Sequence, residues 1–247
     1  MAWQSPKTNW GASDGVRDSD LNRIEGNILE LHNLVGLHSE VYLYVNASSG
    51  NDTTGTGTAA APFATLSRAL QSINRNIGDE VVTINIIGSF LDNVTIRGFT
   101  APIIINATGL TSLLTLTIDG CTVLYTGSQL NVSRGIVLKH GALFYSTSIT
   151  YVGGSNSYGI DVQTGSTFIV LQTVTISNST SVGLEVSTHG RAYVSTLAGT
   201  GNAAVGFRAS SGGVICYGST SIAATTQSVT NTGGRIYAGA QTSVPNY

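Results

Sequence analysis

The chain has 247 residues, of which only 10% are charged and 41% are hydrophobic, and its formal net charge is −2. This length is enough for a substantial core, and the lack of a positive net charge argues against nucleic acid as a partner. Serine and threonine together make up about a quarter of the chain, so we expect a neutral surface that is rich in hydroxyl groups.

Neither membrane insertion nor export is expected from the sequence. The first seven residues contain no apolar run, so we predict no secretory signal peptide, and no stretch approaches the 18 apolar residues of a membrane span. The only cysteines, Cys121 and Cys216, are too few for a disulfide framework and lie in no metal-binding spacing. We therefore expect a soluble protein with no metal and no cofactor.

Residues 1–40 carry much of the chain's charge and predict a helix. Five apolar residues are spaced by 3, 4, 3 and 4, as in a heptad seam: Leu21, Ile24, Ile28, Leu31 and Val35. Two heptads are too short for an isolated coiled coil, but three copies could associate if the rest of the chains also packed together. The alternative is a single amphipathic helix that lies on its own chain. The segment is thus a candidate for attachment and for assembly into a homotrimer.

Residues 41–80 predict a strand, a loop and a short helix. Apolar and tyrosine residues alternate from Val41 to Val45, and a loop rich in glycine and threonine follows. Thr65 is a suitable helix cap, and four apolar residues after it fall on one helical face: Leu66, Ala69, Leu70 and Ile73. We expect this helix to cover the open end of the next region, because an uncovered sheet edge pairs with other chains.

Residues 81–247 repeat themselves. Successive copies begin at Gly135, Gly159, Gly183 and Gly206, at a nearly constant spacing, and a degenerate copy follows from Thr230. Before residue 135 the period is less regular. The copies contain no helical stretch and are too short for a strand, a helical crossover and a second strand. Such a period is typical of a solenoid of β-strands.

Apolar and polar residues alternate in the first strand of each copy, as in a half-buried strand. The apolar pairs are Ile136 and Leu138, Ile160 and Val162, Leu184 and Val186, and Phe207 and Ala209. A second strand is expected to form an internal ladder of Phe144, Phe168, Tyr193, and then Ile215 or Cys216. The sequence predicts an all-β, single-stranded parallel β-helix with about 24 residues per turn, preceded by a short N-terminal helical segment. From residue 81 onward we expect about seven or eight turns.

The segment from Val41 to Asp52, followed by the loop, Pro62–Leu66 and the helix, resembles the beginning of right-handed parallel β-helix proteins of the pectate-lyase-like superfamily. The similarity is confined to this entry region and implies the fold and its right-handed winding. It implies little about activity. A pectate lyase would need a calcium-binding acidic cluster, and the sequence contains none.

Carboxylates are the candidates for chemistry, because enzymes that cleave polysaccharides use pairs of them. Residues 81–247 contain Asp92, Asp119, Asp161 and Glu185. Asp161 and Glu185 both lie two residues after the glycine that opens their repeat, so we expect them to be outward neighbours about 5 Å apart. Arg208 has the same position in the next copy.

Three interpretations of Asp161, Glu185 and Arg208 stay open. They could be a glycosidase pair with an arginine beside it, or an anchoring site for a charged sugar. They could also be a surface ladder in which Arg208 relieves the repulsion between two acids, worth under about 1 kcal/mol. No further acid or base is found at the neighbouring outward positions, Gln163, Ser187 and Ser210.

The histidines predict no metal site. His140 and His189 fall near equivalent positions two turns apart, about 10 Å from each other, which is too far to share one metal ion within a single chain. We expect both to be lone surface histidines. His32 and His38 lie in or just after the N-terminal helix, and His38 continues the heptad. At a threefold axis it could bind an anion or a metal ion, which we do not expect.

Two stretches near the N-terminus, Lys7–Asp14 and Ser19–Asn27, resemble the start of structural proteins of phages and prophages that infect Gram-positive bacteria. In those proteins the segment precedes tail-fibre, tailspike or baseplate modules. The resemblance implies a virion protein whose N-terminal segment binds a tail or baseplate protein, while the β-helix projects outward, usually as a homotrimer. Virion parts leave the host by lysis, which agrees with assembly in the host cytoplasm without a signal peptide.

The sequence therefore predicts three regions: an attachment and oligomerisation segment at 1–40, a first strand, loop and capping helix at 41–80, and the β-helix at 81–247. The predicted function is a tail-fibre or spike component that binds a host surface glycan without enzymatic activity. One alternative is a tailspike that depolymerises polysaccharide through Asp161 and Glu185. Another is a purely structural virion or decoration fibre. A bacterial adhesin is disfavoured, because no export signal is expected.

Overall fold

A computed structural model describes residue 27 and residues 40–73, 81–90, 92–127, 129–147, 149–153 and 158–239. The elements of these residues are β1 (Val41–Asn46), α2 (Leu66–Ser72), β2 (Val82–Ile87), β3 (Asn93–Arg97), β4 (Ile103–Thr108), β5 (Leu110–Asp119), β6 (Thr122–Thr126), β7 (Gln129–Lys139), β8 (Leu143–Ser146), β9 (Ile149–Gly153), β10 (Tyr158–Val162), β11 (Thr167–Ser177), β12 (Val182–Val186), β13 (Arg191–Ala209), β14 (Val214–Thr230) and β15 (Arg235–Ala238). The heptad residues Leu21 to Val35, together with His32 and His38, lie outside the described residues.

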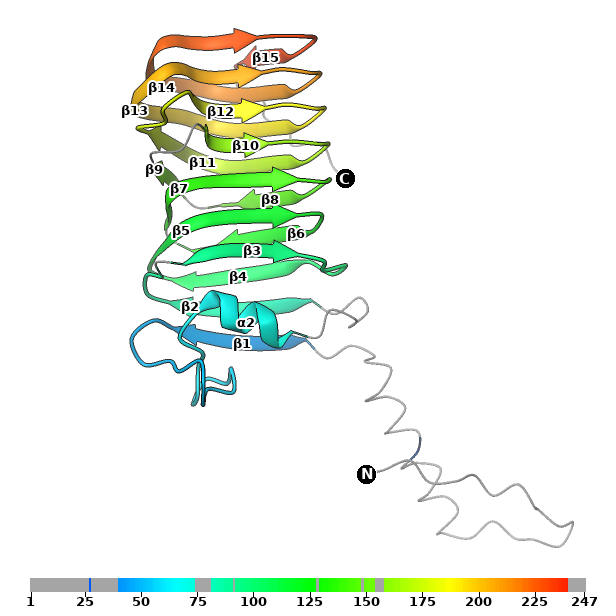
Figure 1. The fold of residues 1–247 in the computed structure, drawn as a ribbon, viewed down its shortest axis with the longest axis vertical. Helices are drawn as coiled ribbons and strands as arrows, with labels where there is room; N and C mark the ends of the chain where they lie inside the picture. Colours follow the sequence, from blue (N-terminus) through cyan, green and yellow to red (C-terminus); the bar gives the residue numbers. More distant parts are fainter. Residues whose placement is uncertain are drawn as a thin grey trace, which may run out of the picture.

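The strands coil into a column in which each turn lies on the one before it (Figure 1). The first face consists of β1, β2, β4, β6 and β8, the first parts of β11, β13 and β14, and β15. The second face consists of the first parts of β5 and β7, then β9, and the middle stretches of the later long strands. The third face consists of β3, the second parts of β5 and β7, then β10, β12, and the last parts of β13 and β14. Each of these pairings is parallel, so the predicted parallel β-helix is confirmed.

The turns are shorter in the first half of the column than the sequence repeat suggests. The early turn that brings Val123 beside Ile103 contains fewer residues than the later turn that brings Phe168 beside Phe144. The mean spacing is thus about 22 residues per turn, below that of the clear repeats, because the early turns have shorter corners. From β2 to β15 the first face has eight rungs, in agreement with the seven or eight expected.

Apolar ladders fill the interior. On the third face the inner side chains Ile136, Ile160, Leu184 and Phe207 follow one another in register and are at most 1% exposed. On the first face, the rings of Phe144 and Phe168 stack with their centroids 5.5 Å apart. Burying these apolar side chains is the main source of stability in such a column.

One rung of the predicted internal ladder is wrong. Phe168 pairs with Ala192 and not with Tyr193, and Ala192 pairs with Ile215. Tyr193 lies one residue further along and therefore on the opposite side of the strand, since side chains alternate. It pairs with Cys216 in an outward ladder.

Helix α2 covers the first turn, as predicted from its apolar face. Leu66, Ala69, Leu70 and Ile73 are all buried in the common core. The Thr65 hydroxyl accepts a hydrogen bond from the Arg68 N–H (3.1 Å), which caps the helix. The Asp52 carboxylate accepts hydrogen bonds from the backbone N–H groups of Ala64 (2.7 Å) and Thr65 (3.0 Å), which ties the preceding loop to the helix start.

The corner from the third face to the first face is made by tight turns with an unusual backbone. In the last five of these corners, both central residues have positive φ, as in type I′ turns: His140–Gly141, Thr164–Gly165, Thr188–His189, Ser211–Gly212 and Thr232–Gly233. The second position of such a turn favours glycine, which four of the five have. His189 is the exception, at φ 62°. We call this stack of corners the turn edge.

Candidate functional site

The predicted neighbours on the third face are brought together by the strand register. Asp161 on β10 pairs with Glu185 on β12, and Glu185 pairs with Arg208 on β13. Parallel strands lie about 4.8 Å apart, so the three side chains stand on successive turns of one outward ladder. The stacking inferred from the repeat is therefore confirmed.

Both oxygens of the Glu185 carboxylate are engaged. Arg208 Nε donates to Oε2 at 2.5 Å, and the Ser210 hydroxyl donates to Oε1 at 2.7 Å. Glu185 is only 5% exposed although its side chain points away from the core. A carboxylate this covered needs such partners, because an unpaired buried charge is strongly destabilising.

Asp161 has a different environment. Its carboxylate accepts a hydrogen bond from Gln163 Nε2, and the residue is 8% exposed. Burial raises the pKa of Asp161 above its ordinary value, and the nearby Glu185 charge raises it further, while the Gln163 hydrogen bond and the Arg208 charge oppose this. The two acids therefore differ in their partners: Glu185 is paired with the cation Arg208, whereas Asp161 accepts its hydrogen bond from the neutral amide of Gln163.

Tyr158, at the start of β10, completes the cluster. Arg208 Nη2 lies 3.5 Å from the Tyr158 hydroxyl, and the guanidinium carbon lies 6.0 Å from the centre of the ring. No sequence pattern pairs Tyr158 with Arg208, because they are two turns apart and at different offsets in their repeats. Gln163 and Ser210, which offer no acid or base, contribute hydrogen bonds instead.

The geometry of this cluster favours a structural role over glycoside hydrolysis. A retaining glycosidase needs two carboxyl groups about 5 Å apart with a sugar between them, one protonated and one free to attack. Asp161 has the raised pKa of an acid, but Glu185 is held by Arg208 and Ser210, and both acids are more than nine-tenths buried. The sequence also predicted that these acids would form an exposed surface ladder. This is wrong, because both acids are buried beneath their hydrogen-bond partners.

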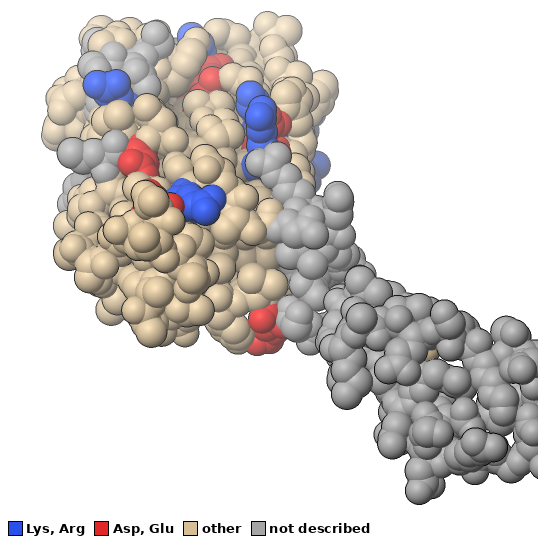
Figure 2. Space-filling model, turned by 60° about the horizontal axis from the view of Figure 1, so that its bottom comes forward, with Lys and Arg blue, Asp and Glu red and all other residues tan. Residues whose placement is uncertain are grey.

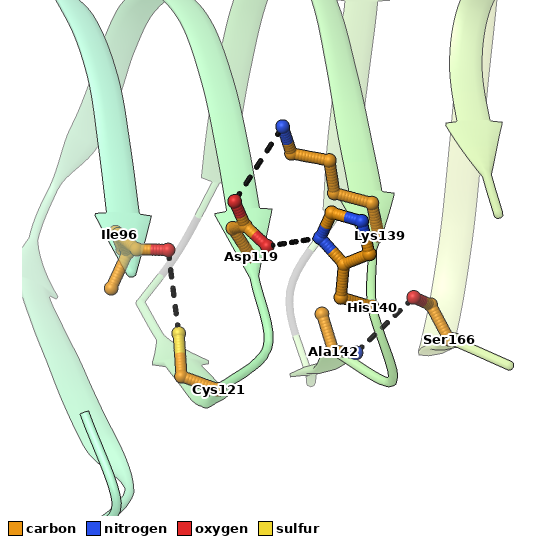
Figure 3. Close-up of polar contacts among 7 residues, drawn as sticks. All are labelled: Ile96, Asp119, Cys121, Lys139, His140, Ala142 and Ser166. Carbon is orange, nitrogen blue, oxygen red and sulfur yellow. Dashed lines mark hydrogen bonds and ion pairs between the residues drawn. The ribbon is translucent and has the colours of Figure 1, made fainter. Parts of the chain in front are cut away.

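A second polar cluster lies where the third face meets the turn edge (Figure 3). His140 Nδ1 lies 2.6 Å from Asp119 Oδ1, and Lys139 Nζ lies 3.5 Å from Asp119 Oδ2. The His140 contact, and then the Lys139 charge, lower the pKa of Asp119. His140 is therefore not the lone histidine expected from the sequence. It is also not equivalent to His189, because His140 takes the first and His189 the second position of its turn.

The described part of the chain offers no evident metal centre. Within it, no group of three or more His, Cys, Asp or Glu side chains could hold a metal ion. Cys121 and Cys216 are both buried and free. The Cys121 thiol donates to the Ile96 carbonyl at 3.3 Å (Figure 3), and burial raises its pKa to about 11. Such a thiol is a packed side chain rather than a nucleophile.

The surface fits the neutral composition of the sequence. Figure 2 shows a face on which the basic and acidic side chains form a few small, separate groups. A hollow across β5, β7 and β9 on the second face is lined in part by Ser112, Gln129, Asn131 and Ser133, with Leu113 and Val132 in its floor. Amide and hydroxyl groups above an apolar floor are suited to binding an uncharged polar ligand.

No helix among the described residues has the length and apolar character that crossing a bilayer requires. Comparison of the chain with protein-family models, with curated proteins and with solved structures finds no match. The fold and the side-chain geometry of the described residues are therefore the structural evidence on function.

Proposed function

We propose that this chain is a receptor-binding component of a bacteriophage or prophage-derived tail fibre or spike, which binds a host surface glycan without cleaving it. The observation that carries the proposal is the hollow on the second face, whose described lining residues carry no charge and which spans three successive turns of a stacked column. A glycan is a repeating chain of hydroxyl groups and apolar C–H patches. Amide and hydroxyl side chains above buried Leu113 and Val132 are complementary to both.

In this proposal, residues 1–40 attach the column to a tail or baseplate protein of the virion. The similarity of Lys7–Asp14 and Ser19–Asn27 to phage structural proteins supports this role. We also propose that three copies associate, with the heptad residues Leu21 to Val35 as one source of contact. Light scattering of the purified chain should then give three times the chain mass of 25.6 kDa, and a mass of one chain at micromolar concentration would refute the trimer.

The receptor role is tested by binding the purified full-length chain to Gram-positive cells and to purified wall and capsular polysaccharides. We expect saturable binding, and a loss of at least tenfold in the double variant Gln129→Ala/Asn131→Ala. Thr196→Ala is the matched control, because Thr196 is an outward residue of the same face, paired in register with Ser219 and away from the hollow. A chain that binds neither cells nor polysaccharide would instead be a purely structural fibre.

The raised pKa of Asp161 beside Glu185 favours one second candidate, a depolymerising tailspike. The same polysaccharides can be assayed for new reducing ends after incubation with the wild type and with Asp161→Asn. Release by the wild type that Asp161→Asn abolishes would establish hydrolysis and replace the non-enzymatic proposal. We expect no release from either protein, because Glu185 is held by Arg208 and Ser210.

A further inference from the structure

A second hollow lies on the turn edge, away from the hollow of the second face. Its floor is formed by Gly141, Ala142 and Leu143 of one turn and Gly165 of the next. Two hydrogen bonds join these corners: the Ala142 N–H donates to the Ser166 hydroxyl at 3.1 Å (Figure 3), and the Gly141 N–H donates to the Thr164 carbonyl at 2.9 Å. The hollow is thus built on corners that are hydrogen-bonded to each other.

Glycine at two successive corners keeps this floor open. Gly141 and Gly165 have φ values of 76° and 70°, and a Cβ atom at either position would meet no other atom within 4 Å. The next corner has His189 at the second position of its turn, where the two preceding corners have glycine. Its imidazole therefore forms one side of the hollow. A Cβ atom at Gly212, one turn further on, would lie only 2.9 Å from His189 Cδ2. The imidazole ring therefore packs closely against Gly212.

The polar side of the hollow is basic. His189, Arg191 and Thr167 line it, and both His189 and Arg191 are exposed to solvent. Among the described residues that line the hollow, none is acidic. A guanidinium and an imidazole beside a hydroxyl are the donors that recognise a carboxylate or a phosphate group.

We propose that this hollow binds a sugar that carries an anionic substituent, a carboxylate or a phosphate. The anionic group contacts Arg191 and His189, and the sugar ring lies on the glycine, Ala142 and Leu143 floor. This inference rests on the proposed glycan-binding function and adds the chemical class of one sugar in that glycan. The uncharged hollow on the second face and this basic hollow would then contact different parts of the same polymer.

The test uses saturation-transfer NMR of the full-length chain with three probes: glucuronate, glucose 6-phosphate and glucose. We expect at least one charged sugar to bind at least fivefold more strongly than glucose, and the stronger of the two identifies the substituent. Arg191→Gln should weaken that binding at least fivefold, and His189→Asn should weaken it measurably. Asparagine is chosen because it tolerates the positive φ of this position.

Arg235→Gln is the matched control. Arg191 pairs with Val214, and Val214 pairs with Arg235. Arg235 therefore lies at the same position two turns further along the turn edge, and it is likewise exposed. It does not line the hollow. The variant should bind the charged sugars as the wild type does, and far-ultraviolet circular dichroism checks that all three variants remain folded. Equal binding of glucose and the charged sugars, or an Arg191→Gln variant that binds normally, would overturn the proposal.

The site and the receptor role can fail separately. If the wild type adsorbs to cells and binds neither charged sugar, this site is refuted and the receptor role stands. If the wild type binds a charged sugar through Arg191 but adsorbs to no cells or polysaccharide, the site stands as a binding site for an anionic sugar and the receptor role is refuted.

Discussion

The inner and outer ladders of the third face belong to the same strands but have very different compositions. The inner ladder runs Ile136, Ile160, Leu184, Phe207, and each of these residues is at most 1% exposed. The outer ladder, one residue along each strand, runs Val137, Asp161, Glu185, Arg208. The backbone hydrogen bonds that stack the turns are the same for both.

The difference shows which positions the fold restricts. An inner side chain has no water to solvate a polar group, so it must be apolar and must fit its neighbours. An outer side chain needs only a partner for any polar group it brings, which Glu185 finds in Arg208 and Ser210. Functional variety in a solenoid can therefore accumulate on the outer ladders and on the turn edge at small cost in stability.

The largest expected effect comes from the inner ladder. Phe207 is fully buried, and its ring packs edge-on against Tyr217 with the ring centres 5.2 Å apart. Phe207→Ala should lower the free energy of unfolding by about 3–5 kcal/mol, because it leaves a cavity that the stacked turns cannot close. Thr95→Ala, at an exposed outer position of the same face, should change it by less than about 0.5 kcal/mol. Urea unfolding followed by circular dichroism measures both, and equal effects would contradict the comparison.

The Glu185–Arg208 pair should give the next largest effect. Arg208→Met removes the cation but leaves a carboxylate that is 5% exposed, which should cost about 2 kcal/mol. The double variant Glu185→Gln/Arg208→Met should regain part of this loss, since no unpaired charge remains. The coupling between the two sites follows from a double-mutant cycle in urea unfolding. Additive effects would show that the pair is no stronger than an ordinary surface contact.

Where the repeat is regular, the sequence predicts positions well. The nearly constant spacing of Gly159, Gly183 and Gly206 places Asp161, Glu185 and Arg208 in one ladder, which the register confirms. In the first strand of each copy, alternation also predicts correctly which side faces the core. The helix cap at Thr65 follows from local pattern alone, because helix capping depends on a few adjacent residues.

The sequence fails where the information is not local to one repeat. The aromatic character of Tyr193 suggests that it continues the phenylalanine ladder, but Ala192 takes that rung and Tyr193 faces outward. The Asp119–His140 contact joins two successive turns in a region where the corners are shorter than in the clear repeats. Alternation gives the direction of the Asp161 side chain but not its burial, which depends on the side chains around it.

Asp161 should have a pH dependence set by its burial. Because its folded pKa is raised, the folded state binds more protons than the unfolded state between the two pKa values, and stability falls as pH rises through that interval. Asp161→Asn removes this loss and should stabilise the protein at neutral pH by about 1 kcal/mol or less. Urea midpoints measured from pH 4 to pH 8 would test this. A variant that is less stable than the wild type at pH 7 would indicate that the charged carboxylate makes a favourable contact.

Asp119 provides the smallest effect and the opposite sign. Its folded pKa is lowered, chiefly by the His140 contact, so its contribution to stability is present above the unfolded pKa and is lost as pH falls through the folded pKa. Asp119→Asn should therefore be slightly less stable than the wild type at neutral pH and indistinguishable from it in strong acid. The effect is small because the His140 side chain is 63% exposed and solvent screens the contact. One molar salt should reduce it further. If Asp119→Asn and Asp161→Asn shift the urea midpoint in the same direction at neutral pH, then burial and pairing do not set the behaviour of acids on this face.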